Sequence, residues 1–237
     1  IEPFWDGNEV WLLTGGGALF AAFPAVYATV FSGLYLALML VLLGLIFRAV
    51  AIEYRNKVDD PRWVGAWDVA FSVGSILPSL LYAVAIGNLL RGMELNAIGD
   101  YTGGFFALLN PYALVVGLVG LSMFAVHGAL YLAIKVGGDI EQRARVWAAK
   151  AWWCYAVLFL VSATWTGLCY LRNGKVLPIA LGLAAAAAIG LIRAFNSKGE
   201  GLKAFLASCA GIALVMLSVV AVLFPNMVVA SNDPALT

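Results

Sequence analysis

The chain has 237 residues, of which 63% are hydrophobic and only 11% are charged, and its formal net charge is +1 at pH 7. Soluble domains carry about 25% charged residues, so these few charges cannot provide the polar surface of a soluble fold. The small net charge also gives no basic field for nucleic acid. The composition excludes a soluble protein and argues against a nucleic-acid-binding one.

Three long stretches, residues 10–47, 69–90 and 101–134, contain no charged residue. A helix of about 20 apolar residues crosses the hydrocarbon core of a membrane, and every backbone polar group there must bond within the protein. The stretches do not alternate in polarity, as the strands of a membrane β-barrel do. The sequence therefore predicts an all-α fold, a polytopic integral membrane helical bundle.

About seven membrane-spanning segments can be placed along the chain, and they form a single membrane domain over residues 1–237. Their approximate ranges are 8–23, 26–50, 69–90, 111–134, 151–171, 176–192 and 204–224. Pro24 predicts a tight turn between the first two segments, and Pro78 predicts a kink in the third. Asn110 before Pro111 predicts a helix N-cap.

The lysines and arginines predict the orientation of these segments. With seven segments, eleven of the basic residues fall on the side where the chain starts, and three fall on the other side. Cytoplasmic connections are rich in Lys and Arg. Residues 1–6 are therefore expected to face the cytoplasm, and the stretch after Phe224 is expected outside.

Acidic side chains near the first and third segments are the first candidates for chemistry. Asp6 and Glu9 are three residues apart, which places them on one face of a helix. Carboxylates at a membrane helix suggest a proton or ion route, and the alternative is a capped interfacial helix start. Asp68 has the same two interpretations, and spacing alone favours the N-cap.

Arg48, Glu53, Arg55 and Lys57 form a charged cluster at the end of the second segment. Such clusters usually set topology, and the alternative is a site for a lipid or quinol head group. His127 is the single histidine. It could be a haem ligand or a proton relay, but we favour a neutral side chain with a structural hydrogen bond. No phosphate loop, nucleophile elbow or zinc motif is present. We predict no catalytic residue and no metal site in this chain.

Several ordered motifs resemble subunit II of the cytochrome bd quinol oxidases. The first is the stretch from Pro3 to Leu12, PFWDGNEVWL, which resembles the signature that opens the second helix of that family. Four further stretches follow in the family's order: GGALFAAFP at 16–24, FSGLY at 31–35, FR at 47–48 leading to EYRNK at 53–57, and YTGGFF at 101–106 leading to LLNP at 108–111. Beyond Lys135 the resemblance depends on hydropathy and scattered residues.

The resemblance implies a fold, a partner and an activity. Family members have nine membrane helices, so this chain is expected to lack the first and the last. The subunit is expected to bind no haem itself and to pair with subunit I, which holds two b-type haems and one d-type haem. The complex oxidises quinol and reduces dioxygen to water in the bacterial cytoplasmic membrane, and it contributes to the proton-motive force. A structural quinone and small accessory subunits remain open.

The resemblance also implies roles for individual residues. Asp6, Glu9 and Asp68 match the proton route, with Asp68 near its cytoplasmic entrance. Trp11 matches a tryptophan of an oxygen-access path. Three further residues match positions that support the complex or its cofactor content: Trp5, Arg48 and Lys57.

The sequence leaves two alternatives to the oxidase subunit. Membrane carboxylates and a kinked helix also suit a secondary transporter or proton-coupled channel, although the sequence shows no clear internal repeat. The other alternative is a purely structural anchor of a different respiratory complex. In that case, neutralising Asp6 and Asp68 would change assembly at most.

Overall fold

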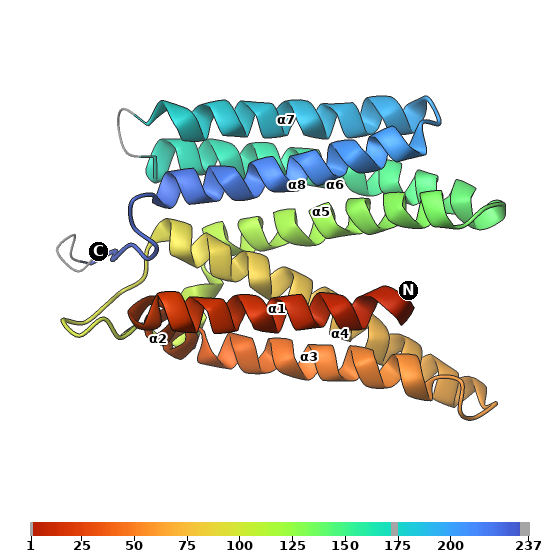
Figure 1. Ribbon diagram of the computed structural model, residues 1–237, viewed down its shortest axis with the longest axis horizontal. Helices are drawn as coiled ribbons and strands as arrows, with labels where there is room; N and C mark the ends of the chain where they lie inside the picture. The colour runs from red at the N-terminus through yellow and green to blue at the C-terminus, as the bar shows by residue number, and fades with distance from the viewer. Residues whose placement is uncertain (1, 172–174, 233–237) are drawn as a thin grey trace.

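The structure is a computed structural model that describes residues 2–171 and 175–232, with side chains from Asp6 onward. Its helices run roughly along one common direction, and α1 begins toward the end of the bundle opposite to the one where α8 ends (Figure 1). In chain order the elements are α1 Glu2–Ala22, α2 Pro24–Gly33, α3 Tyr35–Tyr54, α4 Pro61–Arg91, the 3-10 helix η1 Phe105–Leu109, α5 Pro111–Lys135, α6 Asp139–Cys169, α7 Val176–Ser197 and α8 Gly201–Leu223.

Six of these helices, α3 to α8, are long and apolar enough to cross a membrane. The predicted all-α, polytopic membrane fold is therefore confirmed. The first predicted segment, 8–23, lies in α1, which has 21 residues but is not among the six. Its first turns carry Asp6, Asn8 and Glu9, so its apolar part is short.

The second predicted segment, 26–50, is wrong as one helix, because the chain breaks between α2 and α3. Leu34 lies at the break and is 3% exposed. A Cβ on Gly33 would lie 2.6 Å from the Met93 side chain and 2.9 Å from that of Tyr101. The loop after α4 thus packs directly on the break, a contact that periodicity in the sequence does not reveal.

The start of α4 corrects the interpretation of Asp68 as an N-cap. Asp60 is the N-cap, and its side chain accepts a hydrogen bond of 2.8 Å from the Arg62 amide. Asp68 lies inside α4, which begins eight residues earlier than the predicted start at 69. The N-cap predicted at Asn110 is confirmed, since its side chain accepts from the Ala113 amide at 2.9 Å. Asp60-Pro61 repeats the pattern of Asn110-Pro111, so the same local signal marks the N-cap of α4.

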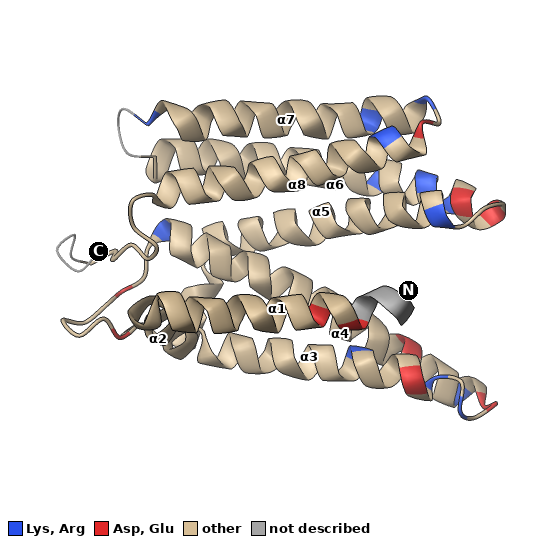
Figure 2. Ribbon diagram, viewed as in Figure 1, with Lys and Arg blue, Asp and Glu red and all other residues tan. Residues whose placement is uncertain are grey.

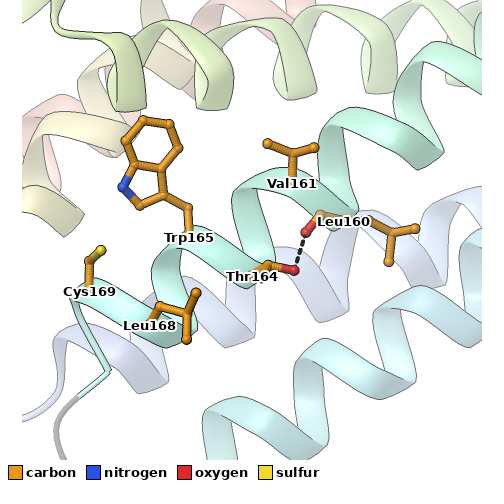
Figure 3. A pocket seen from close by; sticks show the side chains of 6 residues that line it. All are labelled: Leu160, Val161, Thr164, Trp165, Leu168 and Cys169. Atoms are coloured by element: carbon orange, nitrogen blue, oxygen red, sulfur yellow. Dashed lines mark hydrogen bonds between the residues drawn. The ribbon is translucent and has the colours of Figure 1, made fainter.

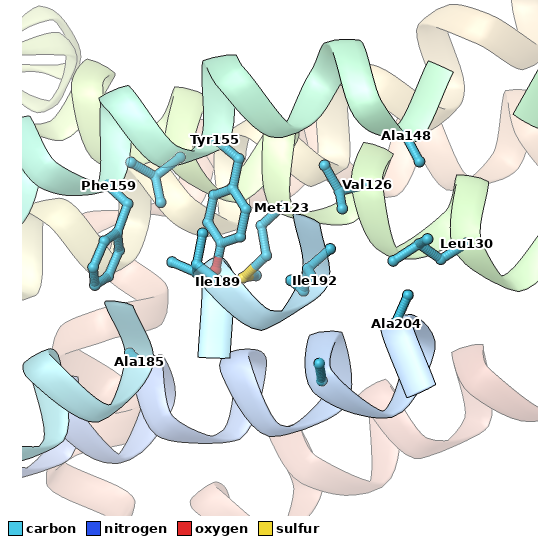
Figure 4. Close-up of a cluster of buried hydrophobic side chains, with 12 residues drawn as sticks. Met123, Val126, Leu130, Ala148, Tyr155, Phe159, Ala185, Ile189, Ile192 and Ala204 are labelled. Atoms are coloured by element: carbon cyan, nitrogen blue, oxygen red, sulfur yellow. The ribbon is translucent and has the colours of Figure 1, made fainter. Parts of the chain in front are cut away.

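The main core lies between α5, α6, α7 and α8 (Figure 4). Leu130, Ala185 and Ala204 in it are fully buried, and Tyr155 is 2% exposed. Small residues let these helices approach closely, as is typical of membrane bundles. α4 connects this group to α3, because it packs against α5 on one side and α3 on the other.

Charged side chains gather at the two ends of the helices and mainly at one of them (Figure 2). We call this the charged end; α1 begins there, and the connections 55–60, 136–138 and 198–200 lie there. At the opposite end, the segment after α8 pairs with the loop after α4. The Met93 amide donates to Val229 O at 2.8 Å, and the Ser231 amide donates to Met93 O at 2.9 Å.

Candidate functional site

The predicted site residues gather toward the charged end of α1, α3 and α4 (Figure 2). The structure joins them into two ion pairs, Glu9 with Arg48 and Arg55 with Asp68. The backbone of Trp5 belongs to α1, but its side chain is not among those that the structure describes.

Glu9 and Arg48 connect α1 to α3. Arg48 Nη2 lies 2.5 Å from Glu9 Oε1, and the two side chains are 27% and 23% exposed. Gly74 lets α4 approach α3 closely beside Arg48, since a Cβ there would lie 2.8 Å from the Arg48 amide nitrogen. The sequence placed Arg48 in a cluster with its neighbours along α3. Its partner Glu9 is 39 residues away in the sequence, so only the fold reveals this pair.

Arg55 and Asp68 hold the connection between α3 and α4. Arg55 Nε donates to Asp68 Oδ1 at 2.6 Å, and Nη2 donates to Oδ2 at 3.2 Å. The Asp68 carboxylate raises the pKa of the Arg55 guanidinium, chiefly through these hydrogen bonds. Trp63 Nε1 donates to Tyr54 O at 2.9 Å. These bonds join the end of α3 to the first turns of α4, and the Asp68 side chain there is half exposed.

α1 presents its side chains outward rather than into this chain. None of its residues from Asp6 to Ala22 is buried, and Trp11 and Leu13 are each 75% exposed. The Asp6 carboxylate is exposed and has no hydrogen bond or ion pair in the described ranges. Lys57 is exposed in the turn after α3. Among the described residues, no side-chain hydrogen bond or ion pair joins Asp6, Trp11 or Lys57 to one another or to the two ion pairs.

His127 lies away from these residues, on α5. Its Nδ1 is 2.7 Å from Ser208 Oγ on α8, and its ring stacks on Phe205 with centroids 4.8 Å apart. When the Ser208 hydroxyl donates to Phe205 O, which lies 2.7 Å away, Nδ1 is the donor to Ser208. The sequence supplies no second histidine for a haem at this place. The bonded, structural interpretation of His127 fits this geometry, and no residue pattern had indicated Ser208.

A groove of about 460 Å³ runs along the outer face of α6 (Figure 3). Its lining residues are Leu160, Val161, Thr164, Trp165, Leu168 and Cys169. The Thr164 hydroxyl donates to Leu160 O within the helix, so the groove offers an apolar surface. Such a surface suits a hydrocarbon chain rather than a reacting polar group. Among the described residues, no group of three His, Cys, Asp or Glu side chains has the arrangement of a metal site.

The chain is similar to one protein family and to several known proteins. The family model described as cytochrome bd terminal oxidase subunit II matches residues 1–237. A probable cytochrome oxidase subunit 2 of Haemophilus influenzae is 45% identical over 181 residues, which covers 74% of this chain and 47% of that protein. The cytochrome bd-I ubiquinol oxidase subunit 2 of Escherichia coli strain K12 is 46% identical over 169 residues, 70% of this chain and 45% of that protein.

A third relative extends along nearly the whole chain. The cytochrome bd ubiquinol oxidase subunit 2 of Bacillus subtilis is 36% identical over 239 aligned residues, which covers 99% of this chain and 70% of that protein. The chain spans about half the length of the first two relatives. Because the family model matches every residue from 1 to 237, this chain belongs to the cytochrome bd terminal oxidase subunit II family.

Proposed function

We propose that this chain is the haem-free subunit of a quinol:oxygen oxidoreductase in the bacterial cytoplasmic membrane. The match of the subunit II family model to residues 1–237 carries the proposal. Two of the relatives are named ubiquinol oxidase subunits. The family assignment favours this function over a secondary transporter, a proton-coupled channel or an anchor of another respiratory complex.

The partner in this proposal is subunit I, with two b-type haems and one d-type haem. Support comes from α1, whose Asp6 carboxylate is exposed toward the outside of this chain. A carboxylate that faces lipid costs free energy, so such groups face protein or water. A second subunit that covers α1 removes this cost and brings Asp6 to the interface. Small accessory subunits are compatible with the same arrangement.

The reduction of dioxygen to water consumes protons, and the haems of the partner supply the electrons for it. The residues of this chain supply the proton route. Asp68 stands half exposed at the α3–α4 connection, where the charged end meets water. Glu9 and Asp6 lie on one face of α1. Carboxylates and the waters between them relay protons in membrane proteins, so the route runs from Asp68 toward the face of α1.

Arg48, Lys57 and Trp5 keep the supporting role that the resemblance implies. Arg48 fastens α1 to α3 through Glu9 and so sets the surface that α1 offers to the partner. Trp11 is largely exposed on that surface, in keeping with an apolar path for dioxygen. The structural quinone that the resemblance leaves open would find an apolar surface for its hydrocarbon chain in the groove on α6. The charged end faces the cytoplasm in this proposal, because it carries most of the lysines and arginines.

The proposal is tested by the substitution Asp6→Asn in the assembled complex. Quinol-driven oxygen uptake per haem is expected to fall by about a hundredfold or more, the range that loss of one positioned proton-transfer group produces. Reduced-minus-oxidised visible spectra report whether the haems are retained. The matched control is Asp139→Asn, which neutralises an exposed carboxylate at the start of α6 and should leave uptake unchanged. Wild-type uptake per haem in Asp6→Asn would contradict the proton role.

A further inference from the structure

The two halves of the charged end carry opposite charge. The half formed by α1, α3, the start of α4 and the connection 55–60 has six carboxylates from Asp6 onward and four basic residues. The half formed by the charged ends of α5 to α8 and their connections has seven basic residues and three carboxylates. Figure 2 shows this separation, with red gathered toward the start of α1 and the α3–α4 connection and blue toward α5 to α8. The seven residues form what we call the basic cluster: Lys135, Arg143, Arg145, Lys150, Arg193, Lys198 and Lys203.

Most of the basic cluster is not neutralised within the chain. Arg145 pairs with Glu141 at 2.8 Å, and Lys203 pairs with Glu200 at 3.0 Å. The other five basic residues have no ion-pair partner in the described part of the chain. Like charges held together repel one another and are stabilised by anions from outside.

The side chains next to the basic cluster are apolar and exposed. Trp147 and Trp153 on α6 are 62% and 59% exposed, and Leu202 on α8 is 61% exposed. Lys150 Nζ lies 5.4 Å from the centre of the Trp147 ring. Tryptophan beside lysine is typical of the boundary between hydrocarbon and head groups. The ligand that fits this surface therefore has both an anionic part and a hydrocarbon part.

We propose that the basic cluster binds the phosphate head groups of anionic phospholipids, and that the exposed side chains of α6 and α8 contact their acyl chains. The charge complementarity selects an anionic lipid over a zwitterionic one. The adjacent apolar surface selects a lipid over free phosphate, which makes no use of Trp147 or Leu202. Since the other half of the same end is acidic, these lipids collect on one side of the protein. This inference needs only that the helices span a membrane, so it stands independently of the proposed function.

The test compares two lipids on the purified protein together with the subunits that purify with it. Native mass spectrometry gives the dissociation constant of the first bound lipid, for phosphatidylglycerol and for phosphatidylcholine with the same acyl chains. We expect the dissociation constant of phosphatidylglycerol to be about tenfold lower than that of phosphatidylcholine, because each nearby basic residue attracts the anionic head group. The double variant Arg143→Gln/Lys198→Gln should reduce this preference to about twofold or less, because it neutralises two exposed cations.

Two control variants make the test specific. Arg62→Gln/Arg91→Gln removes the same charge from exposed residues outside the basic cluster and should keep the preference. Arg143→Lys/Lys198→Arg keeps both charges and should also keep it. Equal binding of the two lipids by the unmodified protein would overturn the proposal, and so would an equal loss of preference in either control. Displacement of phosphatidylglycerol by inorganic phosphate alone would make the ligand a soluble anion and would also contradict it.

Discussion

The helices α5 to α8 and the helices α1 to α3 differ in how much they pack on their own chain. The first group encloses a core whose side chains are fully or almost fully buried, such as Leu130 and Tyr155. In the second group, α2 and the described side chains of α1 include no buried residue. The three buried residues of α3 are Val41, Gly44 and Ala51.

This difference separates the helices that pack closely on one another from the helices that carry most of the predicted site residues. The residues predicted for a site all lie between Trp5 and Asp68, in or next to the weakly packed group. Side chains that contact little within their own chain are available to another molecule. We infer that α5 to α8 form the stable body of the subunit and that α1 to α3 form its contact surface.

The largest expected effect tests the stable body. Leu130→Ala removes a fully buried side chain on α5, so it should lower the free energy of unfolding by about 2–4 kcal/mol through lost contacts and a cavity. Leu13→Ala on α1, where the side chain is 75% exposed, is the matched control and should change it by less than about 0.5 kcal/mol. Unfolding in mixed detergent micelles measures both. Similar losses in the two variants would remove the distinction between the groups.

How much of this arrangement could be predicted from the sequence depends on the range of the interactions. Hydropathy located the long helices, because a membrane span needs only a local run of apolar residues. Asn110 was recognised as a cap because the cap and the amide that it binds are three residues apart. The break at Leu34 is not evident from the sequence, because the loop side chains packed beside it, Met93 and Tyr101, are 60 and 68 residues away from Gly33.

The candidate site follows the same rule. The motif at 3–12 indicated the family, but the sequence assigned Glu9 no partner. Glu9 and Arg48 are 39 residues apart in the sequence, so their ion pair depends on how the fold places α1 relative to α3. Asp68 was assigned to a cap, although Asp60-Pro61 carried the local signal. Asp6 has no hydrogen bond or ion pair among the described residues, so the role proposed for it rests on the family resemblance and not on a contact within this chain.

A second prediction concerns the contact between α3 and α4, which joins α3 to the rest of the helical bundle. A Cβ on Gly74 would lie 2.5 Å from the Gly44 carbonyl oxygen and 2.8 Å from the Arg48 amide nitrogen. Because these are backbone atoms, Gly74→Ala must push the helices apart and should cost about 1–3 kcal/mol of stability. Gly65→Ala, in the same helix with open space around it, should be neutral or stabilising by up to about 1 kcal/mol. The same unfolding assay measures both, and equal effects would show that α4 does not need close contact with α3.

The smallest expected effect concerns the ion pair that fastens α1. A double-mutant cycle with Glu9→Gln, Arg48→Gln and both together isolates the coupling between the two side chains. We expect a coupling of about 1 kcal/mol, because each side chain remains about a quarter exposed and solvent weakens the attraction. The same cycle on Arg55 and Asp68, which are 44% and 53% exposed, should give a smaller coupling. If the Glu9–Arg48 coupling is absent in the separated chain but present in the assembled complex, the partner rather than α3 holds α1 in place. A coupling of the same size in both states would instead mean that this chain presents α1 already positioned for its partner.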